Sequence, residues 1–159
     1  LEPVLRLYDY LESGNGYKVR LLLTQLGVAF ERVELDILKG ETRTAGFLRR
    51  NPNGRIPCLE LEDGTHLWES NAIAFYLAEG TDFLPRGRLE RAQVLQWMFF
   101  EQYSHEPYIA TVRFIRKYLP AQHPRRASLE ALQASGNENG CKNIIQRFSC
   151  TIIQHFNRG

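Results

Sequence analysis

The chain has 159 residues, a length within the range of one or two small domains at about 100–200 residues each. With 43% apolar and 24% charged residues it can bury a real core, which excludes an intrinsically disordered chain. A net charge of +2 is too small to indicate nucleic acid as the main partner.

Cysteine usage and hydropathy exclude two further classes of protein. Cys58, Cys141 and Cys150 show no CxxC spacing, so we predict neither a disulfide framework nor a bound metal. The first residues lack the charged-then-apolar pattern of a signal peptide, and no apolar run approaches the ~20 residues of a membrane helix. We therefore expect a cytoplasmic protein with no membrane partner.

The first eighty residues interleave strand and helix patterns. In chain order the predicted elements are strand 5–10, helix 17–26, strand 30–35, helix 43–50, strands 57–62 and 65–68, and helix 71–79. Asp63-Gly64 is a strong hairpin signal between the last two strands, and Ser70 fits the N-cap of the last helix. The order β-α-β-α-β-β-α predicts an α/β domain over residues 1–80.

After residue 87 the pattern becomes helical. Residues 88–103 show a long helical pattern with a bulky apolar side, and Pro107 can take the first position of a second helix that ends at Pro120. A further helix is predicted over 125–134. We expect residues 81–87 to link the α/β domain to an incomplete all-α domain over 88–159.

The last residues, 139–159, differ in composition from the rest of the chain. They contain no acidic residue and two of the three cysteines. Their isoleucines and phenylalanines keep helical spacing, which fits a terminal amphipathic helix. A foreign tail, produced by truncation or a shifted reading frame, also explains this composition, and the sequence leaves both interpretations open.

Glu69 and Ser70 stand at the predicted start of a helix, which presents unpaired N–H groups and attracts anions. Ser70 could offer its hydroxyl and N–H to a ligand carboxylate, while Glu69 could hold an ammonium group. The pair therefore suits the head of an α-amino acid. An ordinary serine cap beside an exposed glutamate explains the same two residues.

Two other segments carry possible binding chemistry. A cis Ile56-Pro57 bond would turn the Ile56 backbone outward, where an extended peptide can pair with it; the alternative is a trans proline on an edge strand. The segment 13–16, SGNG, follows the first strand, where α/β sheets usually bind ligands. A thiol there would have a lowered pKa beside the helix N-terminus and the Ser13 hydroxyl, although the segment alone is only a turn.

Three segments in order, LYDYLESGNGYKVRLLL, NPNGRIPCLEL and LWESNAIAFYLAE, resemble the N-terminal thioredoxin-like domain of cytosolic glutathione S-transferases. The resemblance covers about residues 4–120 and is closest to serine-type, bacterial members. It implies a thioredoxin-like domain followed by an all-α domain. Ser13 sits where such members place the hydroxyl that stabilises glutathione thiolate, and Asn15 where an asparagine assists or replaces it. Because Tyr8 and Tyr10 lie in the strand, a tyrosine-type site is less favoured.

The resemblance also implies the residues that bind glutathione. Ile56 corresponds to the residue whose backbone pairs with the cysteinyl part, and Pro57 to the family's cis-proline. Glu69 and Ser70 correspond to the pair that holds the γ-glutamyl group. Arg55 lies where several members have a basic residue near the glycine carboxylate. Glutathione would be a co-substrate, and no cofactor is expected.

The second half matches the family less completely. Its members place the electrophile pocket between the two domains, and Tyr103, His105, Tyr108 and Arg113 are candidates for its wall, with core or surface roles as alternatives. No Ser/Thr-x-x-Asp capping box of the kind that supports the family's helical core follows residue 120. We therefore expect a truncated or altered helical domain, whose exposed apolar face would favour dimerisation or aggregation.

Three functions remain open at this point. The leading hypothesis is a glutathione transferase for detoxification, which conjugates glutathione thiolate to a small apolar electrophile. One alternative is glutathione-dependent disulfide reduction at the same site, favoured by Asn15. The other is a non-catalytic or inactive truncated thioredoxin-like module. A homodimer is expected if the helical domain is intact.

Overall fold

The computed structural model describes residues 5–129. The predictions for residues 139–159, and for the last part of the helix at 125–134, lie outside this range. The chain divides between Arg91 and Ala92 into two compact units. The predicted linker, residues 81–87, stays a prediction, because a division by packing need not coincide with a domain boundary.

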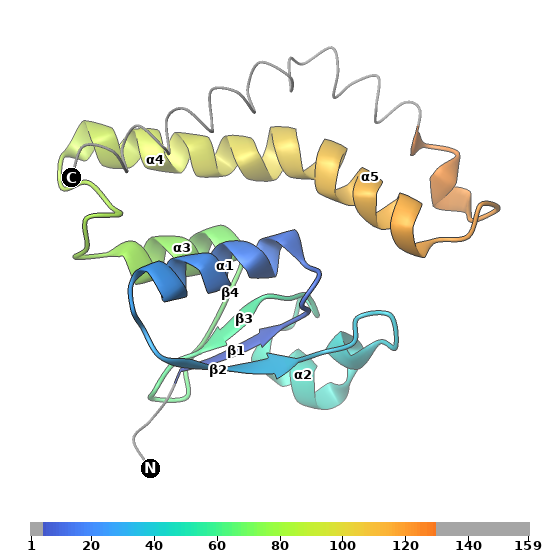
Figure 1. Ribbon diagram of the computed structural model, residues 1–159, viewed down its shortest axis with the longest axis horizontal. Helices are drawn as coiled ribbons and strands as arrows, with labels where there is room; N and C mark the ends of the chain where they lie inside the picture. Colours follow the sequence, from blue (N-terminus) through green and yellow to red (C-terminus); the bar gives the residue numbers. More distant parts are fainter. Residues whose placement is uncertain (1–4, 130–159) are drawn as a thin grey trace. The chain divides into compact units, whose positions relative to one another are not determined.

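The first unit is built on a four-stranded mixed sheet (Figure 1). Its strands are β1 (Leu5–Asp9), β2 (Phe30–Glu34), β3 (Cys58–Glu60) and β4 (His66–Trp68), in the order β2-β1-β3-β4. β1 and β2 are parallel, while β3 is antiparallel to both β1 and β4. With the helices between them, the strands follow the predicted β-α-β-α-β-β-α order, which confirms the thioredoxin-like fold.

Helices cover both faces of this sheet. They are α1 (Gly14–Gln25), α2 (Ala45–Arg50) and α3 (Ser70–Ala78). Figure 1 shows α1 and α3 side by side on one face and α2 on the other. Because successive strand residues point to opposite faces, β1 contributes to two apolar clusters. The buried residues on the α1/α3 side are Leu7, Val19, Leu23, Leu59 and Ile73. The buried residues on the α2 side are Tyr8, Phe47 and Cys58.

The predicted hairpin is present, with shorter strands than expected. Asp63 Oδ1 accepts a hydrogen bond from the Thr65 N–H at 2.8 Å, and Gly64 has a φ of 81°, in the left-handed region. A residue in that region is most often glycine, because glycine lacks a Cβ. The turn therefore depends on the two residues that the sequence singled out.

The described part of the second unit is helical. α4 (Arg88–Phe100) continues through a π-helical turn, Glu101–His105, into α5 (Glu106–Tyr118). The sequence predicted two separate helices, with Pro107 opening the second. Pro107 instead lies second in α5, and because it has no N–H to donate to the carbonyl four residues earlier, a wider π turn is favoured there. Val112 and Ile115 on α5 are buried with Leu129.

Candidate functional site

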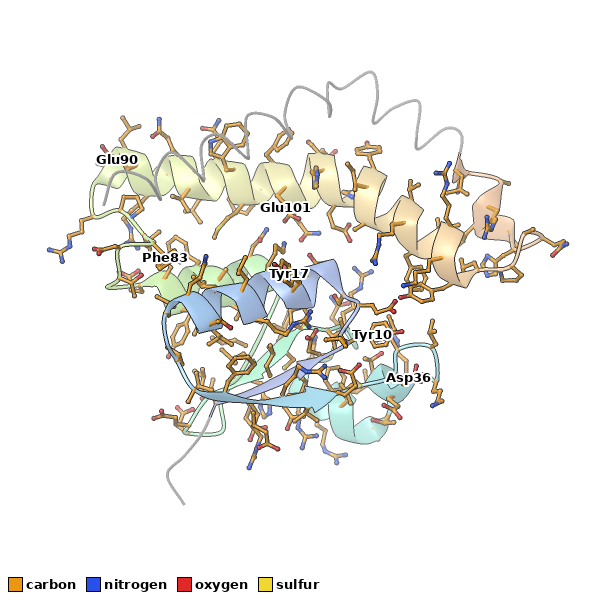
Figure 2. The ribbon with its side chains drawn as sticks, viewed as in Figure 1. Tyr10, Tyr17, Asp36, Phe83, Glu90 and Glu101 are labelled. Carbon is orange, nitrogen blue, oxygen red and sulfur yellow. The ribbon has the colours of Figure 1, made fainter. Side chains whose placement is uncertain are left out.

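Ser13 lies between the end of β1 and the start of α1. Its Oγ accepts a hydrogen bond from the Gly16 N–H at 3.1 Å, so Ser13 is the N-cap of α1, and the helix begins three residues earlier than predicted. Accepting this bond leaves the hydroxyl hydrogen free to serve another acceptor. Nearby side chains include Tyr10, which follows β1, and Tyr17, which projects from α1 and is 56% exposed (Figure 2).

A buried ion pair fixes this turn to the sheet. Asp9 is fully buried at the end of β1 and pairs with Arg20 on α1, which also donates to the Leu11 carbonyl at 2.8 Å. Burial lowers the pKa of the Arg20 guanidinium, and the positive charge of Arg32 lowers it further. A Cβ at Gly16 would lie 1.7 Å from Asp9 Oδ1, so this position requires glycine. The sequence analysis missed the pair, whose only local signal is an acid at the end of an apolar strand.

Asn15 and Ser70 meet across the first unit. The Ser70 hydroxyl lies 3.5 Å from Asn15 Oδ1, and Ser70 is only 4% exposed. The prediction that Ser70 is an N-cap was wrong. Ser70 is the first residue of α3, and Glu69 occupies the cap position without a side-chain cap bond. The Ser70 hydroxyl therefore serves a contact between two helix N-termini.

Glu69 has an unusual backbone. Its φ of 71° lies in the left-handed region, where a residue other than glycine is strained. Its carboxylate is exposed, and Asn53 Nδ2 lies 3.4 Å from Oε1. The turn thus directs the Glu69 side chain towards the loop that precedes Pro57. Strain of this kind clusters at functional sites.

The loop before Pro57 is organised around Asn51. This residue is 1% exposed; its Nδ2 donates to the Arg55 carbonyl at 2.7 Å, and its Oδ1 accepts from the Asn53 N–H at 3.0 Å. The Gly54 N–H also donates to the Asn51 carbonyl at 2.9 Å. Sequence reasoning read Asn51 only as part of the segment 51–54 that ends the preceding helix. Three residues of the loop, Asn53, Gly54 and Arg55, are thereby hydrogen-bonded to Asn51.

The Ile56–Pro57 peptide bond is cis. Within residues 5–129, the backbone N–H and C=O of Ile56 have no hydrogen-bond partner. Pro57 itself is buried, and β3 begins immediately after it at Cys58. A free backbone donor and acceptor therefore stand at the edge of the loop, beside the side chains described above.

Two cations flank this loop. Arg55 is exposed and makes no ion pair within the described part of the chain. Arg43, which the sequence analysis did not single out, donates from Nη1 to the Asn53 carbonyl at 3.1 Å. A Cβ at Gly54 would lie 2.6 Å from that same guanidinium nitrogen. Arg43 is thus the cation packed against the loop, whereas Arg55 is only next to it in sequence.

Cys58 follows Pro57 but lies on the buried side of β3. Burial raises its thiol pKa to about 12, so it is not a reactive thiolate at neutral pH. Residues 5–129 hold no cluster of three or more His, Cys, Asp or Glu side chains that could bind a metal. In the same range, no helix is long and apolar enough to span a membrane.

The four second-substrate candidates fall into two groups. Tyr103 and His105 lie in the π-helical turn, where Tyr103 is 83% exposed. Tyr108 and Arg113 lie on α5 and line one opening of about 500 Å³, together with Ile109 and Val112. Tyr103 and His105 are not among the residues that line it. The structure thus brings together only two of the four, and all four remain candidates.

Comparison with known proteins agrees with this architecture. The model of the glutathione S-transferase N-terminal domain matches residues 3–79. A glutathione S-transferase from Pseudomonas fluorescens has a solved structure with 53% identity and a TM-score of 0.80, covering 85% of this chain and 67% of that one. The glutathione transferase URE2P6 from Phanerochaete chrysosporium, solved with oxidized glutathione, has 32% identity and a TM-score of 0.71. The match covers 84% of this chain and 63% of URE2P6. Protein URE2 of Candida albicans is 32% identical over 121 residues, 70% of this chain and 35% of that protein.

The sheet and its helices define a thioredoxin-like α/β domain followed by a helical region. The chain belongs to the glutathione S-transferase family. The chain covers between 30% and 40% of the length of the curated relatives named Protein URE2. The serine-type assignment and the truncated helical domain stay predictions, and the activity of the whole protein is a matter for proposal.

Proposed function

We propose that this protein is a glutathione transferase, which binds glutathione between the N-terminus of α1, the loop before Pro57 and the N-terminus of α3. The contact between Asn15 and Ser70 carries the proposal, because it joins two helix N-termini beside a free backbone edge at Ile56. Each helix N-terminus offers N–H groups to an anion. The relative solved with oxidized glutathione supports glutathione as the ligand.

Glutathione would lie extended along this groove. The Ile56 N–H and C=O would pair with the backbone of the cysteinyl residue, as in strand addition. The γ-glutamyl carboxylate would accept hydrogen bonds from the Ser70 N–H and hydroxyl, and the Glu69 carboxylate would bind its ammonium group. Arg55 and Arg43, which flank the loop before Pro57, would be the cations available to the glycine carboxylate.

The chemistry would begin with loss of a proton from the glutathione thiol. The Ser13 hydroxyl would donate a hydrogen bond to the thiolate, and the N-terminus of α1 would stabilise its negative charge. Both effects lower the pKa of the thiol. The thiolate would then attack an electrophilic carbon; with a chlorinated aromatic compound, a C–S bond forms and chloride leaves. Proximity and thiolate stabilisation would supply most of the rate enhancement.

Calorimetry with glutathione, followed by turnover of a chlorinated aromatic electrophile, tests this proposal. We expect saturable binding and conjugation at a rate above that of free glutathione. Binding without any conjugation would instead support a non-catalytic thioredoxin-like module. Absence of binding would remove glutathione from the proposal altogether.

A second candidate is glutathione-dependent disulfide reduction at the same site. Oxidized glutathione, the ligand in the URE2P6 structure, is itself a disulfide, and Asn15 lies beside Ser13 at the start of α1. One glutathione thiolate would displace a thiolate from the disulfide, and a second glutathione would resolve the mixed disulfide. Faster turnover of a small disulfide than of the chlorinated electrophile would favour this function. If the helical domain is intact, we further expect a homodimer, which sedimentation would detect.

A further inference from the structure

A polar row crosses the α2 face of the sheet, at the end remote from Ser13. Strand register places Arg6 of β1 opposite Glu60 of β3, and Glu60 opposite His66 of β4. β1 runs from Arg6 towards Asp9 and then Ser13, so this row lies at the start of β1 and the proposed glutathione groove lies beyond its end. The row is therefore separate from that groove and is not used by the proposed function.

The carboxylate in this row is already compensated. Glu60 Oε2 accepts a hydrogen bond from the Tyr8 hydroxyl at 2.6 Å, and Oε1 accepts one from Arg6 Nη1 at 3.3 Å. His66 Nε2 lies 3.5 Å from Oε2. The Tyr8 hydrogen bond is the main reason why the pKa of Glu60 is below its ordinary value, and His66 and Arg6 lower it further. Glu60 thus has little capacity left to bind a cation from solution.

Two arginines of α2 stand over the same row. Arg50 Nη1 donates to the Gly46 carbonyl at 3.0 Å, and its guanidinium lies 5.1 Å from the centre of the Tyr8 ring. These contacts hold the planar group in one orientation. Arg49 is exposed. Neither guanidinium makes an ion pair among residues 5–129, although the Glu60 carboxylate attracts Arg50 at longer range.

These side chains surround an opening of about 240 Å³. Gly46, Arg49 and Arg50 line it from α2, and Glu60 and His66 line it from the sheet. His66 Nε2 is shielded from solvent and lacks a hydrogen-bond partner within the described residues. The opening therefore combines a small volume, two cations that make no ion pair within the described residues and a carboxylate that already accepts two hydrogen bonds.

We propose that this opening is a binding site for a small oxyanion, a phosphate group, held by the guanidinium groups of Arg49 and Arg50. A guanidinium presents paired N–H donors that match two oxygens of a phosphate. The two guanidinium groups together carry two positive charges, which match a phosphate that carries nearly two negative charges at neutral pH. A divalent cation is disfavoured because the oxygens of Glu60 already accept hydrogen bonds. The site does not depend on the proposed glutathione function.

The test is a titration of the full chain with inorganic phosphate, followed by amide NMR at constant ionic strength set with sodium chloride. We expect saturable shifts at Gly46, Arg49 and Glu60. Phenyl phosphate and acetate form two further arms. Binding of inorganic phosphate alone identifies the free ion, and binding of both phosphates identifies the phosphate group of a larger molecule. Acetate binding equal to phosphate binding would overturn the assignment of a phosphate site.

Variants separate a built site from diffuse positive charge. Arg49→Gln should weaken phosphate binding about tenfold, the loss of one charge-assisted hydrogen-bonded contact. Arg86→Gln is the matched control, because Arg86 is exposed and its replacement removes the same charge at a position outside the opening. Arg50→Lys keeps the charge but loses the planar pair of donors, and should also weaken binding. Equal losses in Arg49→Gln and Arg86→Gln, or shifts that never saturate, would overturn the proposal.

Discussion

The hydroxyl of Ser70 lies 3.5 Å from Asn15 Oδ1, so the first turns of α1 and α3 meet although the two residues are 55 positions apart. Two sets of helix N–H groups are thereby brought to one place, next to the Ile56 backbone. A single helix N-terminus can bind one anion. Glutathione needs more, because its γ-glutamyl end and its thiolate each carry negative charge. In the proposed complex with glutathione, the contact would supply two such sites within one small domain.

Replacing Ser13 with alanine tests the thiolate role. We expect the pKa of the thiol of bound glutathione to rise by about one unit, which corresponds to a loss of about 1.4 kcal/mol of thiolate stabilisation. Conjugation should then slow about tenfold at neutral pH. The pKa is read from the ultraviolet absorbance of the thiolate across a pH series. Ser128→Ala is a suitable control, because Ser128 is an exposed serine whose hydroxyl, within residues 5–129, bonds only to the Arg125 carbonyl.

Loss of Ser13 also removes a helix cap, at a cost of about 1 kcal/mol, so unfolding must be measured on the same variant. A variant that is folded, binds glutathione and keeps the wild-type thiol pKa would contradict the role of Ser13. Asn15→Ala then becomes the next variant to compare, because Asn15 is the second polar side chain at this turn.

Gly16 and Gly14 form a matched pair for the packing of α1 on β1. Gly16→Ala places a methyl group against buried Asp9, and we expect it to destabilise the fold by about 1–3 kcal/mol. Gly14→Ala meets nothing within 4 Å and should be neutral or slightly stabilising. Urea unfolding of both variants measures the difference. Equal free energies of unfolding would mean that Asp9 is not held beneath α1 as described.

The order of elements was predictable because each signal is local. Asp63-Gly64 lies inside its own hairpin, and the apolar residues of β1 and α1 show their own periodicity. Contacts between distant residues were not predictable. The Asp9–Arg20 pair depends on how α1 packs on β1, and the Asn15–Ser70 contact depends on how α1 packs beside α3. Nothing near Ser70 in sequence indicates that its hydroxyl faces Asn15.

The same limit explains the error at Ser70 and the omission of Asn51. A serine before an apolar run usually caps a helix, but here the strained backbone of Glu69 takes the cap position and frees the Ser70 hydroxyl. Asn51 fits a turn pattern, yet its role comes from the burial of its side chain beneath its own loop. Burial of that kind is fixed by tertiary packing, which the sequence pattern does not contain.

Asn51→Ala tests whether that loop positions the Ile56 backbone. Two side-chain hydrogen bonds are lost from a buried site, so we expect a loss of about 1–3 kcal/mol in the free energy of unfolding. Glutathione affinity should fall while binding stoichiometry stays at one. Asn53→Ala is the control, because Asn53 is exposed and, among the residues that the structure describes, its side chain bonds only to Glu69. Calorimetry should show a smaller loss of affinity for Asn53→Ala, and the reverse order would contradict this assignment.

Glu60 predicts a dependence of stability on pH. Its folded-state pKa is lowered, mainly by the hydrogen bond from Tyr8, so the folded state favours the ionised form. The stabilisation is therefore fully present above the ordinary glutamate pKa of about 4.3 and is lost as the pH falls through the lower, folded-state value. Tyr8→Phe removes the main cause and should make this loss of stability on acidification smaller.

Urea unfolding from neutral pH down to the acid limit measures that loss in wild type, Tyr8→Phe and Glu60→Gln. The control is Glu62→Gln, because Glu62 is exposed and makes no hydrogen bond within residues 5–129; it should retain the wild-type dependence. Glu60→Gln cannot ionise, so its stability should change least below the ordinary glutamate pKa. If wild type and Tyr8→Phe lose the same stability over this range, the hydrogen bond between Tyr8 and Glu60 does not favour the ionised carboxylate in the folded protein.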